Sequence, residues 1–234
     1  MSWKEEEKKR AALESAKLVK TGQVVGLGTG STIYYVVEEL GRRVREEGLK
    51  IIGIPTSNQT EAQAKGCGIA LTTLDEHPQI DIAIDGADQV DPNLNLIKGM
   101  GGALTREKIV DSAAKYFVIV VDESKMSNKL GINQPIPIEV IPMALTPVMN
   151  KIKSLGGNPI VRQPTKTNSK YFVTDNGNFV IDADFGEIKN PEKLEIDLKM
   201  IPGVVENGLF INMTHKVYVG EKTSVKVIDK ETKS

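Results

Sequence analysis

The sequence is poor in the residues that build disulfides and metal sites. Among its 234 residues are one cysteine, Cys67, and two histidines, His77 and His215. A single thiol excludes an internal disulfide, so we expect Cys67 to be a small buried residue of a protein kept in a reducing compartment, the cytoplasm. The two histidines stand alone, without the spacing of zinc ligands, and we therefore expect no metal.

Long hydrophobic runs and a strong charge of one sign are missing as well. No stretch approaches the 18 apolar residues of a membrane helix, and the charged residues 1–10 lack the apolar segment of a signal peptide. The formal net charge is −1, so we expect neither a nucleic acid nor a membrane as partner. The apolar share of 40% and the charged share of 26% are typical of a globular protein.

The first half of the chain alternates between helical and strand patterns. Apolar residues at helical spacing predict helices over residues 8–20, 31–47, 56–65 and 104–115. Short apolar runs predict strands over residues 23–27, 51–54, 69–71, 80–84 and 116–121. Repeated strand–helix–strand units predict an α/β domain with a mostly parallel sheet that is covered on both faces.

The composition changes near Gly131, where several prolines follow one another and suggest a hinge. After it, the patterns predict a small α+β domain. Its expected elements are a helix over 147–155, a strand over 158–162, strands over 171–174 and 178–182 joined by a turn at 175–177, and a helix over 191–200. Apolar runs at 209–213 and 216–220 are expected to return to the first domain, and residues 221–234 to form a solvated tail.

The first candidate site is the sequence GLGTGST at residues 26–32, between a strand and a helix. Such a turn offers backbone N–H groups to an anion, and Ser31 and Thr32 add hydroxyls. The dinucleotide pattern fails at Ser31, and no lysine follows the glycines as in a P-loop, so a mononucleotide or sugar phosphate fits better. The alternative is a tight turn with Ser31 as helix N-cap.

The second candidate is Asp85-Gly86-Ala87-Asp88, directly after the strand predicted at 80–84. Ligands of open α/β sheets bind at the carboxyl ends of the strands, and two carboxylates can hold sugar hydroxyls there. Crowding of the two also favours an acid with a raised pKa. The alternative is ordinary turn chemistry, with Asp88 as a cap.

The third candidate is KGMGGALTRE, residues 98–107. Glycines beside Lys98 can bring backbone donors and a positive charge to a developing oxyanion, and Glu107 falls at the start of the next helix. Glu107 is no capping-box residue, because position 104 is leucine. A favourable charge at a helix N-terminus remains the alternative for Glu107.

Seven ordered motifs carry a resemblance to one family. Besides GLGTGST and DGAD they are IKGMGGALTREKI (97–109), DESK (122–125), PIPIEVIPMA (135–144), VTDNGN (173–178) and IPGVVENGLF (201–210). On these motifs the chain resembles the type A ribose-5-phosphate isomerases, and the resemblance runs over almost its whole length.

The resemblance implies an α/β fold with a Rossmann-like, mostly parallel sheet domain (residues 1–133 and 207–234) and a second, smaller α+β domain of ferredoxin-like type (134–206). It implies a cofactor-free and metal-free enzyme that interconverts ribose 5-phosphate and ribulose 5-phosphate. The expected partners are a small-molecule sugar phosphate and further copies of the chain, in a homodimer or homotetramer.

Site residues follow from the same resemblance. Glu107 is expected to be the general base, Lys98 to stabilise the enediolate, Asp85 to assist ring opening and Asp88 to orient hydroxyls. The expected substrate-binding residues are Thr29, Gly30, Ser31, Thr32, Asp85, Gly86, Ala87, Asp88, Lys98, Gly99, Met100, Gly101 and Lys125. Whether the turn at 29–32 or Lys125 holds the phosphate stays open, as does the division of roles between Asp85 and Asp88.

The sequence departs from the family pattern at two places. Met100 stands where the family commonly has glycine, and residues 164–170 look like an insertion, which we expect to affect assembly more than chemistry. Two other kinds of protein compete with an isomerase. One is a regulatory module that binds a sugar phosphate without turnover, and the other is an acyl-CoA transferase or sugar-phosphate deaminase of related fold.

Overall fold

The computed structural model describes residues 3–164 and 169–230. The chain forms two compact units. The larger unit comprises Met1–Ala87, Arg106–Met126 and Asn212–Ser234, and the smaller unit comprises Asp88–Thr105 and Ser127–Ile211. The expected boundaries at 133/134 and 206/207 stay a prediction. The compact units differ from them chiefly in grouping residues 88–105 with the smaller unit.

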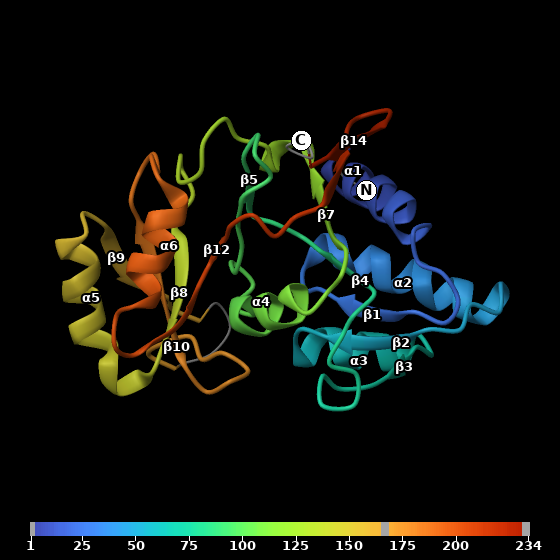
Figure 1. Ribbon diagram of the computed structural model, residues 1–234, viewed down its shortest axis with the longest axis horizontal. Helices are drawn as coiled ribbons and strands as arrows, with labels where there is room; N and C mark the ends of the chain where they lie inside the picture. Colours follow the sequence, from blue (N-terminus) through green and yellow to red (C-terminus); the bar gives the residue numbers. More distant parts are fainter. Residues whose placement is uncertain (1–2, 165–168, 231–234) are drawn as a thin grey trace. The chain divides into compact units, whose positions relative to one another are not determined.

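The larger unit is built on a seven-stranded sheet in the order β14-β13-β7-β4-β1-β2-β3 (Figure 1). Its strands are β1 (Val24–Leu27), β2 (Ile52–Pro55), β3 (Ala70–Leu71), β4 (Ile82–Asp85), β7 (Phe117–Asp122), β13 (Lys216–Gly220) and β14 (Val225–Asp229). All neighbours pair in parallel except β14, which runs antiparallel to β13. The predicted mostly parallel sheet is confirmed.

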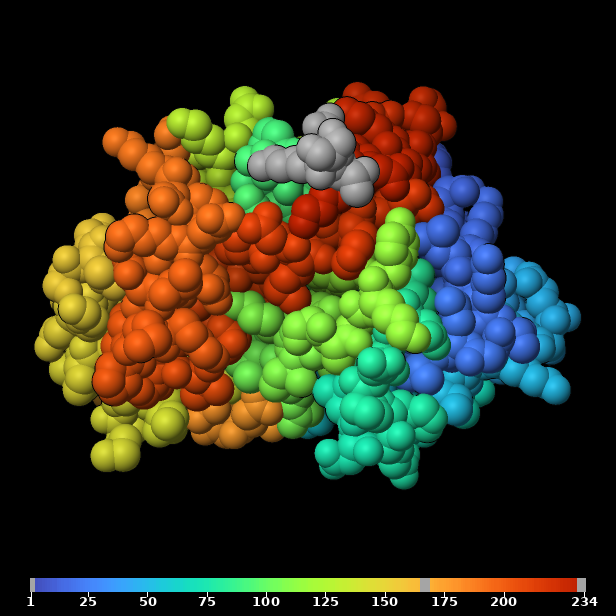
Figure 2. Space-filling model, in the orientation of Figure 1, coloured from blue at the N-terminus to red at the C-terminus, as the bar shows by residue number. Residues whose placement is uncertain are grey.

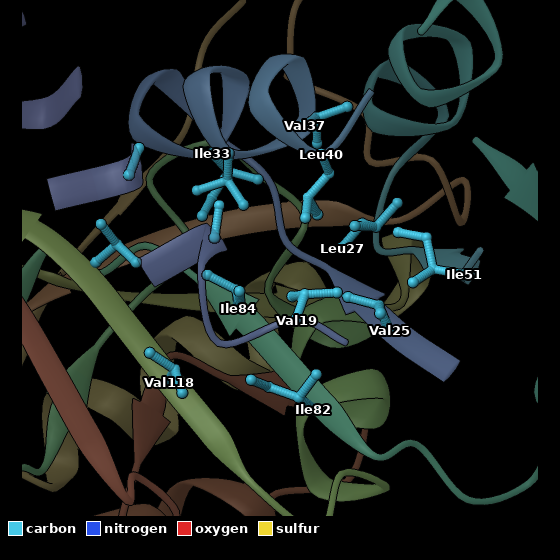
Figure 3. Close-up of a cluster of buried hydrophobic side chains, with 14 of the residues drawn as sticks. Val19, Val25, Leu27, Ile33, Val37, Leu40, Ile51, Ile82, Ile84 and Val118 are labelled. Carbon is cyan, nitrogen blue, oxygen red and sulfur yellow. The ribbon is translucent and has the colours of Figure 1, made fainter. Parts of the chain in front are cut away.

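Helices cover both faces of this sheet (Figure 1). They are α1 (Trp3–Ala16), α2 (Ser31–Glu46), α3 (Asn58–Gly66) and α4 (Leu104–Ser112). The buried residues of α2 recur at helical spacing, and they pack with strand residues such as Leu27 and Ile84 into one apolar cluster (Figure 3). Val110 of α4 packs against Ile54 and Ile80 in a separate cluster.

A glycine in β1 lets α4 approach the sheet closely. A Cβ at Gly26 would lie 2.8 Å from Cβ of Ala83 and 2.9 Å from Cγ1 of Val110. Side chains do not tolerate such distances, so this position needs glycine for packing. The first glycine of GLGTGST therefore serves the fold.

Two expectations at the ends of the chain are wrong. The first helix spans Trp3–Ala16 instead of 8–20. The chain turns at Lys17, and Val19, whose spacing suggested a longer helix, is buried outside it. Residues 221–234 were expected to be a tail, yet Val225–Asp229 form strand β14, which lies at the surface of the unit (Figure 2). None of its five residues is buried, so the segment lacks the continuous apolar run that would mark a buried strand.

The smaller unit carries a four-stranded antiparallel sheet in the order β11-β8-β10-β9. Its elements are β8 (Ile136–Val140), α5 (Leu145–Ser154), β9 (Asn158–Val161), β10 (Phe179–Asp184), α6 (Pro191–Lys199) and β11 (Val204–Asn207). This βαββαβ succession is the ferredoxin-like arrangement. A second, three-stranded sheet joins β12 (Leu209–Phe210), β6 (Leu96–Ile97) and β5 (Gln89–Val90).

Two details of the smaller unit differ from expectation. The proline-rich segment read as a hinge contains β8, a buried central strand, in which Pro137 loses only its N–H while its carbonyl accepts the N–H of Gly208 at 2.7 Å. Residues 171–174 form no strand, because β9 occupies that edge of β10 from Ile181 to Asp184. Only an isolated bridge joins Val173 to Phe179.

Part of the insertion proposed at 164–170 lies outside the described residues, namely 165–168. Within the described residues, no helix is long and apolar enough to cross a lipid bilayer.

Candidate functional site

The glycine turn after β1 is tied to the carboxylate of Asp85 at the end of β4. Asp85 is fully buried, and its Oδ1 accepts the N–H of Thr29 at 3.0 Å and the N–H of Gly86 at 2.6 Å. A Cβ at Gly28 would lie only 2.1 Å from that oxygen. Glycine at 28 thus permits a contact between two motifs that were proposed separately from the sequence.

Thr29 is held on its other side by hydroxyl groups. Its Oγ1 lies 2.7 Å from Oγ1 of Thr56, 2.8 Å from Oγ of Ser57 and 3.2 Å from Oγ1 of Thr60. Thr60 also donates to the carbonyl of Gly28 at 2.8 Å. The N–H and the hydroxyl of Thr29 are both engaged by the protein, so this residue stiffens the turn.

Helix α2 begins directly after this turn, at Ser31. Gly30 is the N-cap, with φ 125°, and no side chain caps the helix, so the reading of Ser31 as N-cap is wrong. Uncapped N–H groups at a helix start are suited to an anion. Lys8 of α1 lies beside them, with Nζ 3.0 Å from Oγ of Ser31. Nothing in the sequence distinguishes Lys8 from the other charged residues at positions 1–10, so it was not predicted as a site residue.

Lys125 lies at the same edge of the sheet. Strands β1, β4 and β7 are parallel neighbours, so their carboxyl ends lie side by side. Lys125 ends the short 3-10 helix Glu123–Lys125 that follows β7, and Asp122 caps this helix by accepting the N–H of Ser124 at 3.0 Å. The turn at 28–32, Asp85 to Ala87 and Lys125 are therefore gathered at one edge of the larger unit.

Glu107 lies in the first turn of α4, where the sequence placed it. Its side chain is buried, with 3% of the residue's surface exposed. Carboxylates are rarely buried to this degree unless the protein uses or compensates them. Its neighbour Arg106 points to another partner, the side-chain oxygen of Asn58 at 3.0 Å.

The remaining predicted residues belong to the smaller unit and form a compact loop of their own. Lys98 is 2% exposed, and its ammonium lies 5.3 Å from the ring centre of Phe210. Gly99 has φ 105°, and the N–H of Gly102 returns to its carbonyl at 2.9 Å. This tight turn presents residues 99–101 as a loop next to the buried lysine.

Asp88 is bound to that loop. Its Oδ2 accepts the N–H of Met100 at 2.9 Å. Met100 is 45% exposed and is absent from the residues with positive φ, so the backbone at this position does not require glycine. The departure from the family pattern at Met100 is therefore compatible with a regular loop.

Two polar residues of the smaller unit, the half-buried Arg162 and the buried Glu139, were not predicted from the sequence. Arg162 donates to the carbonyls of Gly99 and Met100 at 2.9 and 3.0 Å. Glu139 of β8 is fully buried and accepts four side-chain hydrogen bonds. These partners of both residues lie more than 30 residues away in the sequence. For Glu139 the one local signal is a charged residue within an apolar run, and Arg162 has no such signal.

The histidines and the cysteine take no part in these groups. Nδ1 of His215 accepts the backbone N–H of Phe117 at 3.0 Å, and burial lowers the pKa of its imidazole. Cys67 is buried, and burial and the carboxylate of Glu38 raise the pKa of its thiol to about 11. Among the described residues, no group of three or more His, Cys, Asp or Glu side chains could hold a metal ion.

Comparison with known proteins agrees with this arrangement. The family model described as Ribose 5-phosphate isomerase A (phosphoriboisomerase A) matches residues 52–224. Ribose-5-phosphate isomerase A of Methanosarcina acetivorans is 52% identical over 226 residues, which are 96% of this chain and 95% of the relative. The protein of the same name from Methanothermobacter thermautotrophicus is 52% identical over 221 residues, which are 94% and 96% of the two chains.

Solved structures give the same result. Ribose 5-phosphate isomerase A of Methanocaldococcus jannaschii superposes with a TM-score of 0.93 at 48% identity, covering 97% of this chain and 99% of that chain. A D-ribose-5-phosphate isomerase in complex with phospho-erythronic acid gives a TM-score of 0.94 at 43% identity, covering 98% and 100%. These relatives are isomerases with an α/β fold. The chain belongs to the ribose 5-phosphate isomerase A family.

Proposed function

We propose that this protein interconverts D-ribose 5-phosphate and D-ribulose 5-phosphate through an enediolate, with Glu107 as the general base. The observation that carries the proposal is Glu107 itself, a carboxylate buried in the first helical turn after the glycine loop, in a chain that matches its relatives almost end to end. One carboxylate can take a proton from one carbon and return it to the next, which contributes a factor of about 10² to 10⁴.

The other residues divide the remaining work. Lys98 and the amides near Gly99 and Gly101 stabilise the negative oxygen of the enediolate, because fixed donors act strongly where water is excluded. Asp85, oriented by two backbone N–H groups, assists opening of the furanose ring. Asp88 orients the sugar hydroxyls. Gly86 and Ala87, which connect the two carboxylates, contact the substrate between them.

For the phosphate we propose the start of helix α2. The N–H groups of Ser31 and Thr32, the hydroxyl of Ser31 and the ammonium of Lys8 converge there, whereas Thr29 stiffens the turn and Gly30 lets it close. Lys125 adds a second positive charge at the same edge of the sheet. Phospho-erythronic acid, which a related isomerase holds, is a phosphorylated sugar acid and fits this class of ligand.

The setting of the enzyme follows from its family. We propose a cytoplasmic homodimer or homotetramer that acts in the non-oxidative part of pentose phosphate metabolism and needs neither metal nor organic cofactor. Size-exclusion chromatography with light scattering checks the subunit count.

The proposal is tested by turnover of ribose 5-phosphate with EDTA present. We expect ribulose 5-phosphate to form at an undiminished rate. Binding of the sugar phosphate without turnover would replace the proposal with the regulatory module. Ammonia release from an amino-sugar phosphate would indicate a deaminase, and an acyl adduct on a glutamate would indicate a transferase.

A further inference from the structure

Two consecutive peptide groups of the glycine loop point their carbonyl oxygens at one guanidinium group. Nη1 of Arg162 donates to the carbonyl of Gly99 at 2.9 Å and to the carbonyl of Met100 at 3.0 Å. All three residues belong to the smaller unit, and the side chain of Arg162 is only 11% exposed. A single planar cation therefore fixes the orientation of two adjacent peptide planes.

Arg162 is itself held in place from two sides. Nε donates to Oδ2 of Asp182 at 2.9 Å, and Nη2 forms an ion pair with the other carboxylate oxygen. The guanidinium also lies 5.7 Å from the ring centre of Phe172. Since Asp182 neutralises its charge and the carbonyls occupy Nη1, Arg162 is unsuited to bind the substrate phosphate directly.

The orientation of the carbonyls determines the orientation of the amides. The described chain contains no cis peptide bond, and in a trans peptide the C=O of one residue and the N–H of the next point in opposite directions. The N–H groups of Met100 and Gly101 therefore point away from Arg162. The hydrogen bond of the Met100 N–H is consistent with this direction, because it donates to Oδ2 of Asp88 at 2.9 Å and not to a group of Arg162.

We propose that Arg162 is a positioning residue of the isomerase, which aims the backbone N–H of Gly101 at the oxygen that becomes negative in the enediolate. The N–H of Met100, which also points away from Arg162, holds the carboxylate of Asp88. This inference rests on the proposed function, in which amides of this loop stabilise the enediolate. Gly101 is exposed and has no side chain of its own to screen its N–H from a ligand.

The test compares Arg162→Met with a matched arginine elsewhere. Arg43 of the larger unit also donates to two backbone carbonyls, those of Ala16 and Val19, and pairs with the carboxylate of Glu47. Arg43→Met therefore removes the same chemistry from a place outside the loop. Both variants should lose comparable thermal stability, and only Arg162→Met should lose activity.

We expect Arg162→Met to lower kcat by about 10² with little change in KM, which is the size of effect seen when one oxyanion donor is removed. Phospho-erythronic acid, whose carboxylate resembles the enediolate, should bind this variant more weakly by a similar factor. Arg162→Lys should recover part of kcat, and Asp182→Asn should lower kcat as Arg162→Met does. If Arg162→Met does not fold, the kcat values of Arg162→Lys and Asp182→Asn test the same proposal.

Two results separate the inference from the proposed function. If the wild-type protein does not turn over ribose 5-phosphate, the proposed function fails. If the wild type is active and the Arg162 variants keep the kcat and the phospho-erythronic acid affinity of Arg43→Met, the positioning role is overturned while the isomerase activity stands. A rise in KM alone, with kcat unchanged, would also overturn it, because that indicates ground-state binding.

Discussion

The hydroxyl of Thr105 donates a 2.7 Å hydrogen bond to Oε2 of Glu139, which lies 34 residues further along the chain. The other oxygen of Glu139 accepts from Thr174 at 3.0 Å, Asn176 at 3.0 Å and Asn178 at 2.8 Å. One buried carboxylate thus joins strand β8, the turn of the motif VTDNGN and the first turn of helix α4. Four donors compensate the burial of its charge.

Replacement of Glu139 by alanine should therefore destabilise the protein strongly. We expect the free energy of unfolding to fall by about 3 kcal/mol or more, because buried donors would lose their acceptor. Glu139→Gln retains one oxygen and should cost less. Urea unfolding gives both values, with Glu187→Gln, an exposed glutamate paired with Lys129, as the control. Equal stability of the alanine variant and this control would contradict the account.

Gly28 should tolerate no side chain. A Cβ there would lie 2.1 Å from Oδ1 and 2.7 Å from Cα of Asp85, so Gly28→Ala must displace either the turn or the strand. We expect a loss of about 3 kcal/mol of stability and of most activity. Gly66→Ala is the control, because no atom lies within 4 Å of its added Cβ and helix α3 favours alanine. Similar Tm values for the two variants would contradict the prediction.

Glu7 of α1 should make stability depend on pH. It is fully buried, and within the described part of the chain neither carboxyl oxygen has a hydrogen-bond partner. Burial, with the charges of Asp122 and Glu123, raises the pKa of Glu7 above its usual value, against a smaller opposite effect of Lys222 and Arg10. The folded protein therefore holds this proton more tightly than the unfolded chain.

The stabilising contribution of protonated Glu7 is complete below the unfolded value of 4.5 and is lost as the pH rises through the folded pKa. Glutamine does not ionise, so Glu7→Gln should not lose this contribution as the pH rises. We expect the Tm of Glu7→Gln, relative to that of the wild type, to increase from pH 4.5 to pH 8. Glu6→Gln, an exposed neighbour on the same helix, should show no such trend. A constant Tm difference for Glu7→Gln would refute the raised pKa.

The proposed roles of Asp85 in ring opening and of Glu107 in proton transfer should be distinguishable by deuterium exchange. Ribulose 5-phosphate has no free 5-hydroxyl and cannot close to a furanose, so exchange of its C1 proton requires no ring opening. Asp85→Asn keeps an oxygen for the N–H groups of Thr29 and Gly86. It should slow conversion of ribose 5-phosphate by about 10² yet retain deuterium exchange of ribulose 5-phosphate in D2O. Equal loss of both rates would exclude the ring-opening role.

The sequence predicted those features that depend on neighbouring residues. The strand, the glycine turn and the helix at 23–47 needed only local apolar spacing, and the structure places them within one or two residues. The carboxylates at 85 and 88 followed a strand end in the same way. Glu107 was predicted at the start of its helix, and it lies in the first turn of α4.

What the sequence could not predict depends on contacts between distant segments. The clamp of Arg162 on Gly99 spans 63 residues and requires the register of β9 against β10. Strand β8 was hidden by its prolines, because a proline removes an N–H from the ladder, and only the structure shows that the carbonyl of Pro137 still pairs, with the N–H of Gly208. Lys8 reaches Ser31 only after α1 has packed beside α2, and no motif indicates this contact.

In the proposed reaction one buried carboxylate, that of Glu107, transfers the proton. The test follows the conversion of ribose 5-phosphate in D2O by the wild type, by Glu107→Gln and by Glu14→Gln, a half-buried glutamate of α1 that pairs with Lys17. We expect deuterium at C1 of the product from the wild type and Glu14→Gln, and a kcat at least about 10²-fold lower for Glu107→Gln, which still binds substrate. A near-normal kcat in Glu107→Gln would contradict this role.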